Sequence, residues 1–139
     1  MPGELDALID GVKRKWAALG ITPLAGATDS SIAAFEQRHG VRMPEDLRTW
    51  FRSFGGTELN EWDEELIRFW KLDEVQPAEV APDFFVFADY SISAHEYAVH
   101  ISESDTRVVM LAAPARRPVA PSFAAFLHVY LHDPERLFV

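Results

Sequence analysis

The sequence predicts an α+β domain, in which N-terminal helices and a C-terminal helix pack on a largely antiparallel or mixed sheet of about four to six strands. Apolar residues recur at helical spacing up to residue 56, alternate or form short runs between residues 66 and 112, and return to helical spacing after residue 122. Helices, then strands, then a helix is the element order of an α+β fold. With 139 residues, the chain is expected to form a single domain over residues 1–139.

The first predicted helix occupies about four turns before Gly20. Its apolar residues recur every three or four positions, and Gly20 followed by Pro23 is a typical stop signal. Thr28, Asp29 or Ser30 could cap the next helix. The apolar positions of the first helix are Leu5, Leu8, Ile9, Val12, Trp16 and Leu19.

Residues 32–56 predict two further helices separated by a short connection. Gly40 suits the left-handed residue that closes a helix, and Pro44 has its φ already set for a first helical turn. Gly55 and Gly56 then end the second of these helices. Its buried face is predicted to consist of Leu47, Trp50, Phe51 and Phe54.

The middle of the chain predicts strands. Residues 66–72 alternate, with Ile67 and Phe69 on one face and Arg68 and Trp70 on the other. Residues 84–88 form a short apolar run typical of a buried strand. Residues 95–101 and 107–112 are expected to pair as a hairpin with a longer loop.

The C-terminal part predicts an exit from the sheet followed by one helix. Pro114 and Pro118 mark the exit, and Ser122 can cap the helix. Asp133 and Pro134 end it. The apolar face of this helix is predicted to comprise Phe123, Phe126, Leu127, Tyr130 and Leu131.

Charge is concentrated in the middle third of the chain. The net charge is −9, yet residues 57–105 hold 13 acids against two bases, Arg68 and Lys71, whereas the remainder holds 9 acids and 11 bases. Such a field repels phosphate backbones and anionic membranes and attracts basic partners. We therefore expect a protein partner, no nucleic acid and no membrane, although acids in loops could equally serve solubility alone.

Composition excludes several classes of chemistry. The chain has no cysteine, which rules out disulfides, thiol nucleophiles and Cys-ligated metals. The N-terminus shows no secretory signal, and no window approaches the roughly 18 apolar residues of a membrane helix, so a cytoplasmic protein is expected. His128 and His132 are four residues apart and share a helical face, but the sequence lacks the Glu of a His-Glu-x-x-His metal site. Histidines near the C-terminus of a helix also interact favourably with the helix dipole.

No motif for catalysis is present. A Gly-x-Ser-x-Gly elbow is missing, and Gly55-Gly56 precedes Thr-Glu rather than Gly-Lys-Ser. Adjacent acids in a polar loop are usually solvated, whereas general acid–base catalysis needs one of them desolvated. The sequence therefore predicts a non-enzymatic protein without metal or cofactor.

The candidate partner-binding residues surround Trp62 and follow the strand at residues 84–88. Trp62 could anchor a partner whose Arg and Lys side chains meet the flanking carboxylates, or it could fold back on the core as a lid. Asp89 could cap a turn through its own backbone, or be presented at an edge beside Tyr90. The full set is Glu58, Glu61, Trp62, Asp63, Glu64, Glu65, Asp89 and Tyr90.

Four ordered segments resemble the SUKH superfamily, in the branch related to a fungal regulator of cell-wall assembly. The resemblance spans residues 28–132. The segments are Ile32 to Gly56 (with Phe35-Glu36, Gly40-Val41, Pro44-Glu-Asp46-Leu47 and Trp50-Phe51), Phe69-Trp70-x-Leu72, Phe87-Ala-Asp89-Tyr90 with Tyr97-Ala-Val99, and Ser122-Phe123-x-x-Phe126-Leu127.

The resemblance implies an α+β fold with a mixed sheet and a function in binding. For bacterial members it implies an immunity protein that neutralises a cognate toxin, and the acidic middle of the chain would fit a basic toxin such as a nuclease. The alternative is a regulatory scaffold that binds a cellular partner, as in the fungal relatives.

Overall fold

The structure is a computed structural model that describes residues 2–54, 67–79, 82–90, 95–102, 105–112 and 115–138. Within these residues it contains four α-helices and six β-strands, which confirms the α+β class. The helices are α1 (Pro2–Ala18), α2 (Asp29–His39), α3 (Glu45–Ser53) and α4 (Phe123–His132). The strands are β1 (Ile67–Phe69), β2 (Gln76–Pro77), β3 (Phe84–Tyr90), β4 (His95–His100), β5 (Val108–Ala112) and β6 (Ala115–Ala120), and two 3₁₀ turns are η1 (Leu72–Glu74) and η2 (Pro134–Phe138).

The sheet is an antiparallel meander in the order β1-β3-β4-β5-β6. Strand β2 also pairs with β3, opposite Phe85 and Val86, whereas β1 pairs with the end of the same strand, opposite Ala88 to Tyr90. One edge of the sheet therefore consists of two short strands separated by η1, and the other edge is β6.

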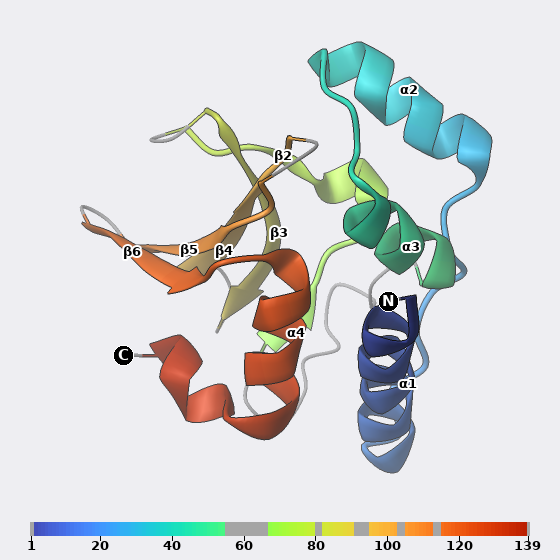
Figure 1. Cartoon of the computed structure of the whole chain (residues 1–139), viewed down its shortest axis with the longest axis vertical. Helices are drawn as coiled ribbons and strands as arrows, with labels where there is room; N and C mark the ends of the chain where they lie inside the picture. Colours follow the sequence, from blue (N-terminus) through green and yellow to red (C-terminus); the bar gives the residue numbers. More distant parts are fainter. Residues whose placement is uncertain are drawn as a thin grey trace.

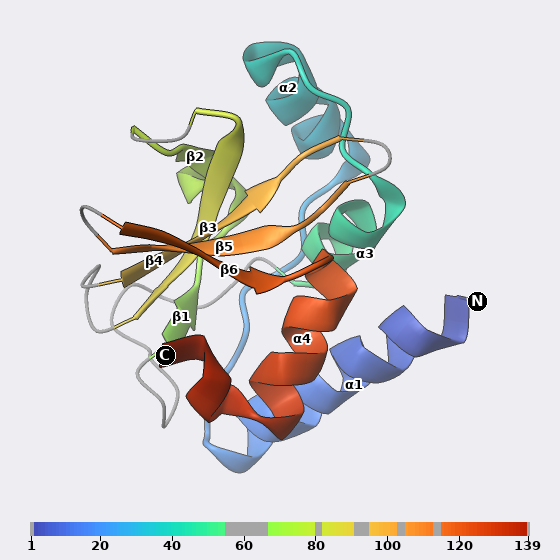
Figure 2. The same cartoon turned by 60° about the vertical axis from the view of Figure 1, so that its left-hand side comes forward.

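Helices cover one face of this sheet (Figures 1 and 2). Helices α1, α3 and α4 lie on that face, with α1 beside α4, and α2 lies at the end of the molecule where it contacts β3 through Phe35 and Phe85. The ring of Phe69, 1% exposed, is at the centre of the main core. Its ring contacts are Trp16, Trp50, Phe87, Phe126 and Tyr130, at centroid distances of 5.0–6.1 Å.

The predicted helix ends are confirmed with small shifts. The Thr28 hydroxyl accepts the N–H of Ser31, and the Ser122 hydroxyl accepts the N–H of Ala125, so both residues are N-caps. Gly40 closes α2 in the left-handed region, with φ +64°. Pro44 is the N-cap of α3 rather than its first helical residue, and Phe54 is the extended C-cap, which ends the helix one residue before Gly55.

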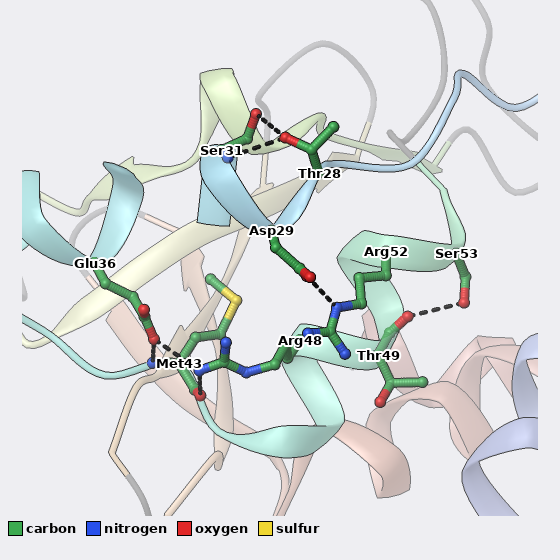
Figure 3. Close-up of polar contacts among 9 residues, drawn as sticks. All are labelled: Thr28, Asp29, Ser31, Glu36, Met43, Arg48, Thr49, Arg52 and Ser53. Atoms are coloured by element: carbon green, nitrogen blue, oxygen red, sulfur yellow. Dashed lines mark hydrogen bonds and ion pairs between the residues drawn. The ribbon is translucent and has the colours of Figure 1, made fainter. Parts of the chain in front are cut away.

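The Glu36 carboxylate of α2 forms hydrogen bonds that hold α2 and α3 together (Figure 3). Glu36 accepts the backbone N–H of Met43 at 2.7 Å and Nη2 of Arg48 at 2.9 Å, and the same Nη2 donates to the carbonyl of Met43 at 3.1 Å. Both charged side chains are largely buried, with 20% and 26% exposure. The Phe-Glu pair of the N-terminal motif therefore fixes the connection between two helices.

The start of α2 is held against the end of α3 by a close backbone approach. The N–H of Ala27 donates to the carbonyl of Phe51 at 2.7 Å, and a Cβ added to Gly26 would lie 1.9 Å from the carbonyl oxygen of Arg52. Position 26 therefore requires glycine for space. An exposed ion pair between Asp29 and Nε of Arg52, at 2.8 Å, lies beside it (Figure 3).

Two strands were not predicted, and two boundaries differ. Strand β6 includes Pro118, which was expected only to mark the exit from the sheet, and β2 lies between the strands predicted at residues 66–72 and 84–88. A proline without an N–H is tolerated at β6 because this strand is an edge. Strand β3 continues to Tyr90, and β4 ends at His100, one residue before its predicted end. The longer connection predicted between β4 and β5 spans residues 101–107, where Ser102 and Asp105 form an isolated bridge.

Candidate binding face of the sheet

The eight predicted partner-binding residues divide into two groups. Asp89 and Tyr90 are described, and both belong to β3. The other six lie outside the described residues, so their surface role and the lid alternative for Trp62 stay predictions. They are Glu58, Glu61, Trp62, Asp63, Glu64 and Glu65.

Asp89 is a strand residue, which corrects the expectation that it caps a turn. It is 6% exposed and is paired across the sheet with Arg68 on one side and Glu96 on the other. Cross-strand pairing thus outweighs the local preference of aspartate for turns. Because Glu96 and Ala98 alternate with Tyr97, the row of Arg68, Asp89 and Glu96 lies on the face away from the helices. This face, which also carries Val86, is termed the outer face.

Tyr90 points the other way. Its side chain packs against the main core, and its ring lies 5.6 Å from that of His95, the residue opposite it on β4. Asp89 and Tyr90 are adjacent in sequence but occupy opposite faces of the sheet, as strand alternation requires. The structure therefore does not join them into one surface patch.

The charged row on the outer face combines one cation with several carboxylates. Arg68 is 3% exposed, and its Nη2 donates to Oε1 of Glu74 at 2.6 Å. Burial raises the pKa of Glu96, and the charges of Asp89 and Glu79 raise that pKa further. Asp89 and Glu79 therefore each lie close enough to Glu96 to disfavour its ionised form, and these three carboxylates give this part of the outer face an excess of acidic groups.

The sequence could predict the sheet face on which Arg68 and Glu96 lie, but it could not predict the residues with which they pair. Alternation already placed Arg68 opposite Ile67 and Phe69, and the structure confirms that assignment. The same alternation beside Tyr97 and Val99 would have placed Glu96 on that face. Its pairing with Asp89 depends on the register between β3 and β4, which no local pattern reveals.

Replacing Glu96 by glutamine should stabilise the protein at neutral pH. The folded-state pKa of Glu96 is raised, so the folded chain holds this proton more tightly, and ionisation of Glu96 costs stability as pH rises above its unfolded pKa. We expect Glu96→Gln to raise the free energy of unfolding at pH 7 by about 0.2–1 kcal/mol, the usual cost of like charges opposite each other on neighbouring strands.

Urea unfolding at several pH values would measure this effect. The gain should disappear below a pH of about 4.3, where glutamate is protonated in both states. Glu135→Gln, at an exposed site in η2, is the matched control and should change little. A gain for Glu96→Gln that is the same at pH 4 and pH 7 would contradict the proposed repulsion.

The outer face also has a small apolar cluster and a pocket beside it. The pocket has a volume of about 430 Å³ and lies where β3 and β5 begin and β6 ends. Arg107 is its charged lining residue, and Phe84 and Val109 connect it to the cluster. The cluster consists of Ala78, Phe84, Val86, Ala98, Val109 and Leu111, with Trp70 packed against it.

The histidines at the C-terminal helix do not build a metal centre within the described residues. His128 and His132 are exposed on α4 with ring centroids 4.6 Å apart, and no set of three His, Cys, Asp or Glu residues in that part of the chain could hold an ion. His95 and His100 project to opposite faces of β4, as their spacing predicted, since His95 contacts Tyr90 and His100 contacts Phe84.

Together these features define an α+β domain with a helix-covered antiparallel meander and an outer sheet face that carries charged side chains and a small buried apolar cluster. Residues 26–128 match the SMI1 / KNR4 family (SUKH-1), and the chain belongs to this family. The match covers most of the segment that carries the motifs, and it confirms the predicted resemblance. Comparison with curated proteins gave no match.

Family membership supports a role in binding or immunity, since members are in general non-catalytic immunity or regulatory proteins. None of the described helices combines the length and the apolar composition that crossing a bilayer requires.

Proposed function

We propose that this protein is a non-catalytic immunity protein that binds and neutralises a cognate bacterial toxin with a basic surface. The observation that carries this proposal is the group of carboxylates on the outer face, where burial raises the pKa of Glu96 and the charges of Asp89 and Glu79 raise it further. Family membership supports the same type of role.

Repulsion between the carboxylates of this face favours the binding of a basic partner. Lysine or arginine side chains placed over Glu79 and Glu96 would turn an unfavourable interaction of the free protein into a favourable one in the complex. Glu79 is exposed, and so are Asp73 and Asp83 on the segments that flank β2, so long-range attraction would also speed association at low salt. A basic nuclease, whose active site attracts phosphate, fits this description.

The proposal is tested with the product of the gene next to this one. The two proteins are co-expressed, and complex formation and cell survival are measured together. Toxin neutralisation predicts a stable complex and survival of cells that die without this chain. A complex with a cellular protein that has no toxic activity would instead favour the regulatory scaffold, and absence of both complex and protection would refute the immunity role.

A charge-reversal variant tests the surface itself. In E79K/D83K both altered side chains are exposed, so the fold should persist, while affinity for a basic partner should fall about tenfold or more because like charges then meet. The matched control is E4K/D10K, which makes the same change of net charge on exposed positions of α1, on the helix side of the sheet. Equal losses in both variants would show that only net charge matters.

A further inference from the structure

The last turn of α2 contains a titratable side chain that the proposed function does not use. His39 is the final residue of α2, and its ring packs against two phenylalanine rings, at centroid distances of 4.5 Å from Phe35 and 5.3 Å from Phe85. Phe35 belongs to the same helix, whereas Phe85 belongs to β3. His39 is therefore part of the contact that holds this end of α2 on the sheet.

Protonation of His39 is unfavourable in this contact. Its Nε2 is buried, and it has no hydrogen-bond partner in the part of the chain that the structure describes. A neutral imidazole can carry its proton on Nδ1 and leave Nε2 as an acceptor, whereas an imidazolium carries an N–H at both nitrogens. A charged donor at a buried atom without an acceptor costs free energy, and this cost disappears when the ring moves into water.

The surroundings of His39 favour its neutral form. Burial lowers the pKa of His39, and the positive charge of Arg38 lowers it further. The residues at this level of the sheet are uncharged, since Phe85 of β3 pairs with Pro77 of β2 and Val99 of β4. A helix C-terminus ordinarily favours a charged histidine, so burial and Arg38 oppose the dipole of α2 at this position.

Release of this contact should remain local. Glu36, in the same turn of α2, accepts hydrogen bonds from Met43 and Arg48, and these hold α2 to α3 without His39. Gly40 follows His39 with φ +64°, and a Cβ added there would meet no described atom within 4 Å, so the chain has room to move at this point. We propose that protonation of His39 releases the last turn of α2 from β3, which makes this end of the helix a pH-sensitive element of the fold.

The direction of the pH dependence follows from linkage. Folding lowers the pKa of this base, so the contribution of the contact to stability is fully present above the unfolded pKa of about 6.5 and is lost as pH falls through the folded pKa. Each unit by which docking lowers the pKa makes the released turn about tenfold more populated at low pH. The inference goes beyond the proposed function and does not depend on any partner.

The test uses NMR of the full chain labelled with ¹⁵N and ¹³C, between about pH 5 and about pH 8. The His39 ring should titrate at a lower pH in the folded chain than in the chain unfolded in urea. Toward the acidic end, the amides of Gly40 and Val41, which both donate to the carbonyl of Glu36, should exchange about threefold faster or more after correction for intrinsic rates. The amide of Asp133, the C-cap of α4, should keep its protection.

Two variants separate the effect of His39 from a general effect of acid. His39→Phe keeps an aromatic ring against Phe85 but cannot be protonated, so Gly40 and Val41 should have the same protection at both ends of the pH range. His132→Phe makes the same change at an exposed position of α4, and its Gly40 and Val41 amides should respond to pH as in the unaltered chain.

Four results would overturn the proposal. The first is titration of His39 in the folded chain at or above its pKa in the unfolded chain. The second is unchanged protection of Gly40 and Val41 while His39 titrates, because the charged ring would then stay in place. The third is a loss of protection that persists in His39→Phe. The fourth is an equal loss at Asp133, which would show acid unfolding of the whole domain.

Discussion

Phe69→Ala is expected to reduce the free energy of unfolding by about 3–5 kcal/mol, because it removes a buried ring that contacts five others. The cavity would lie where α1, α3, α4 and the sheet meet, so no single element could close it by a local shift. Urea unfolding followed by tryptophan fluorescence should show a lower midpoint with an unchanged slope.

Leu19→Ala is the matched control for this substitution. Leu19 follows α1 and is 38% exposed, so its truncation should change stability by less than about 0.5 kcal/mol. If Phe69→Ala does not fold, Phe69→Leu, which keeps much of the apolar volume, should fold with a smaller loss. A loss below about 1 kcal/mol for Phe69→Ala would contradict the central position of this ring.

Glu36→Ala is expected to reduce stability by about 1.5–3 kcal/mol. The carboxylate accepts hydrogen bonds from Met43 and Arg48, and its removal leaves a backbone N–H and a largely buried guanidinium without this acceptor. The measurement is again urea unfolding, at a salt concentration high enough to suppress exposed ion pairs. This prediction assigns the most recognisable acid of the N-terminal motif to folding rather than to binding.

Asp29→Asn provides the comparison, since the ion pair of Asp29 with Arg52 is exposed. Loss of this ion pair should lower the free energy of unfolding by less than about 1 kcal/mol, and this decrease should disappear at high salt. Glu36→Gln, which keeps one acceptor oxygen, should lie between Glu36→Ala and the unaltered chain. Equal losses for Asp29→Asn and Glu36→Ala would show that burial of the Glu36 contacts contributes nothing.

The helices were predictable because their signals are local. Helical spacing of apolar residues and capping residues both act over about one turn of the chain. The structure confirms the predicted caps Thr28, Gly40 and Ser122. Strand β6 was missed for the same reason. Pro118 argues against a strand when only its neighbours are considered, whereas pairing with β5, a non-local contact, overrides that preference.

The candidate site was less accessible to sequence reasoning than the fold. Charge counting identified the acidic middle of the chain, but six of its eight candidate residues, those from Glu58 to Glu65, lie outside the described residues. Asp89 was assigned to a turn because no sequence pattern shows that Arg68 and Glu96 flank it across the sheet. The Arg107 pocket depends on a one-residue shift between β5 and β6, which becomes visible only when the strands are paired.

The interrupted edges of the sheet have a consequence for the behaviour of the protein at high concentration. A long straight edge strand is a template on which further copies can add by backbone pairing and so aggregate. Among the described residues, one edge is broken between β1 and β2 by η1, and β6 lacks an N–H at Pro118 and is bulged at Val119. The sheet therefore resists growth at both edges, which would allow a cell to keep a reserve of free protein without precipitation.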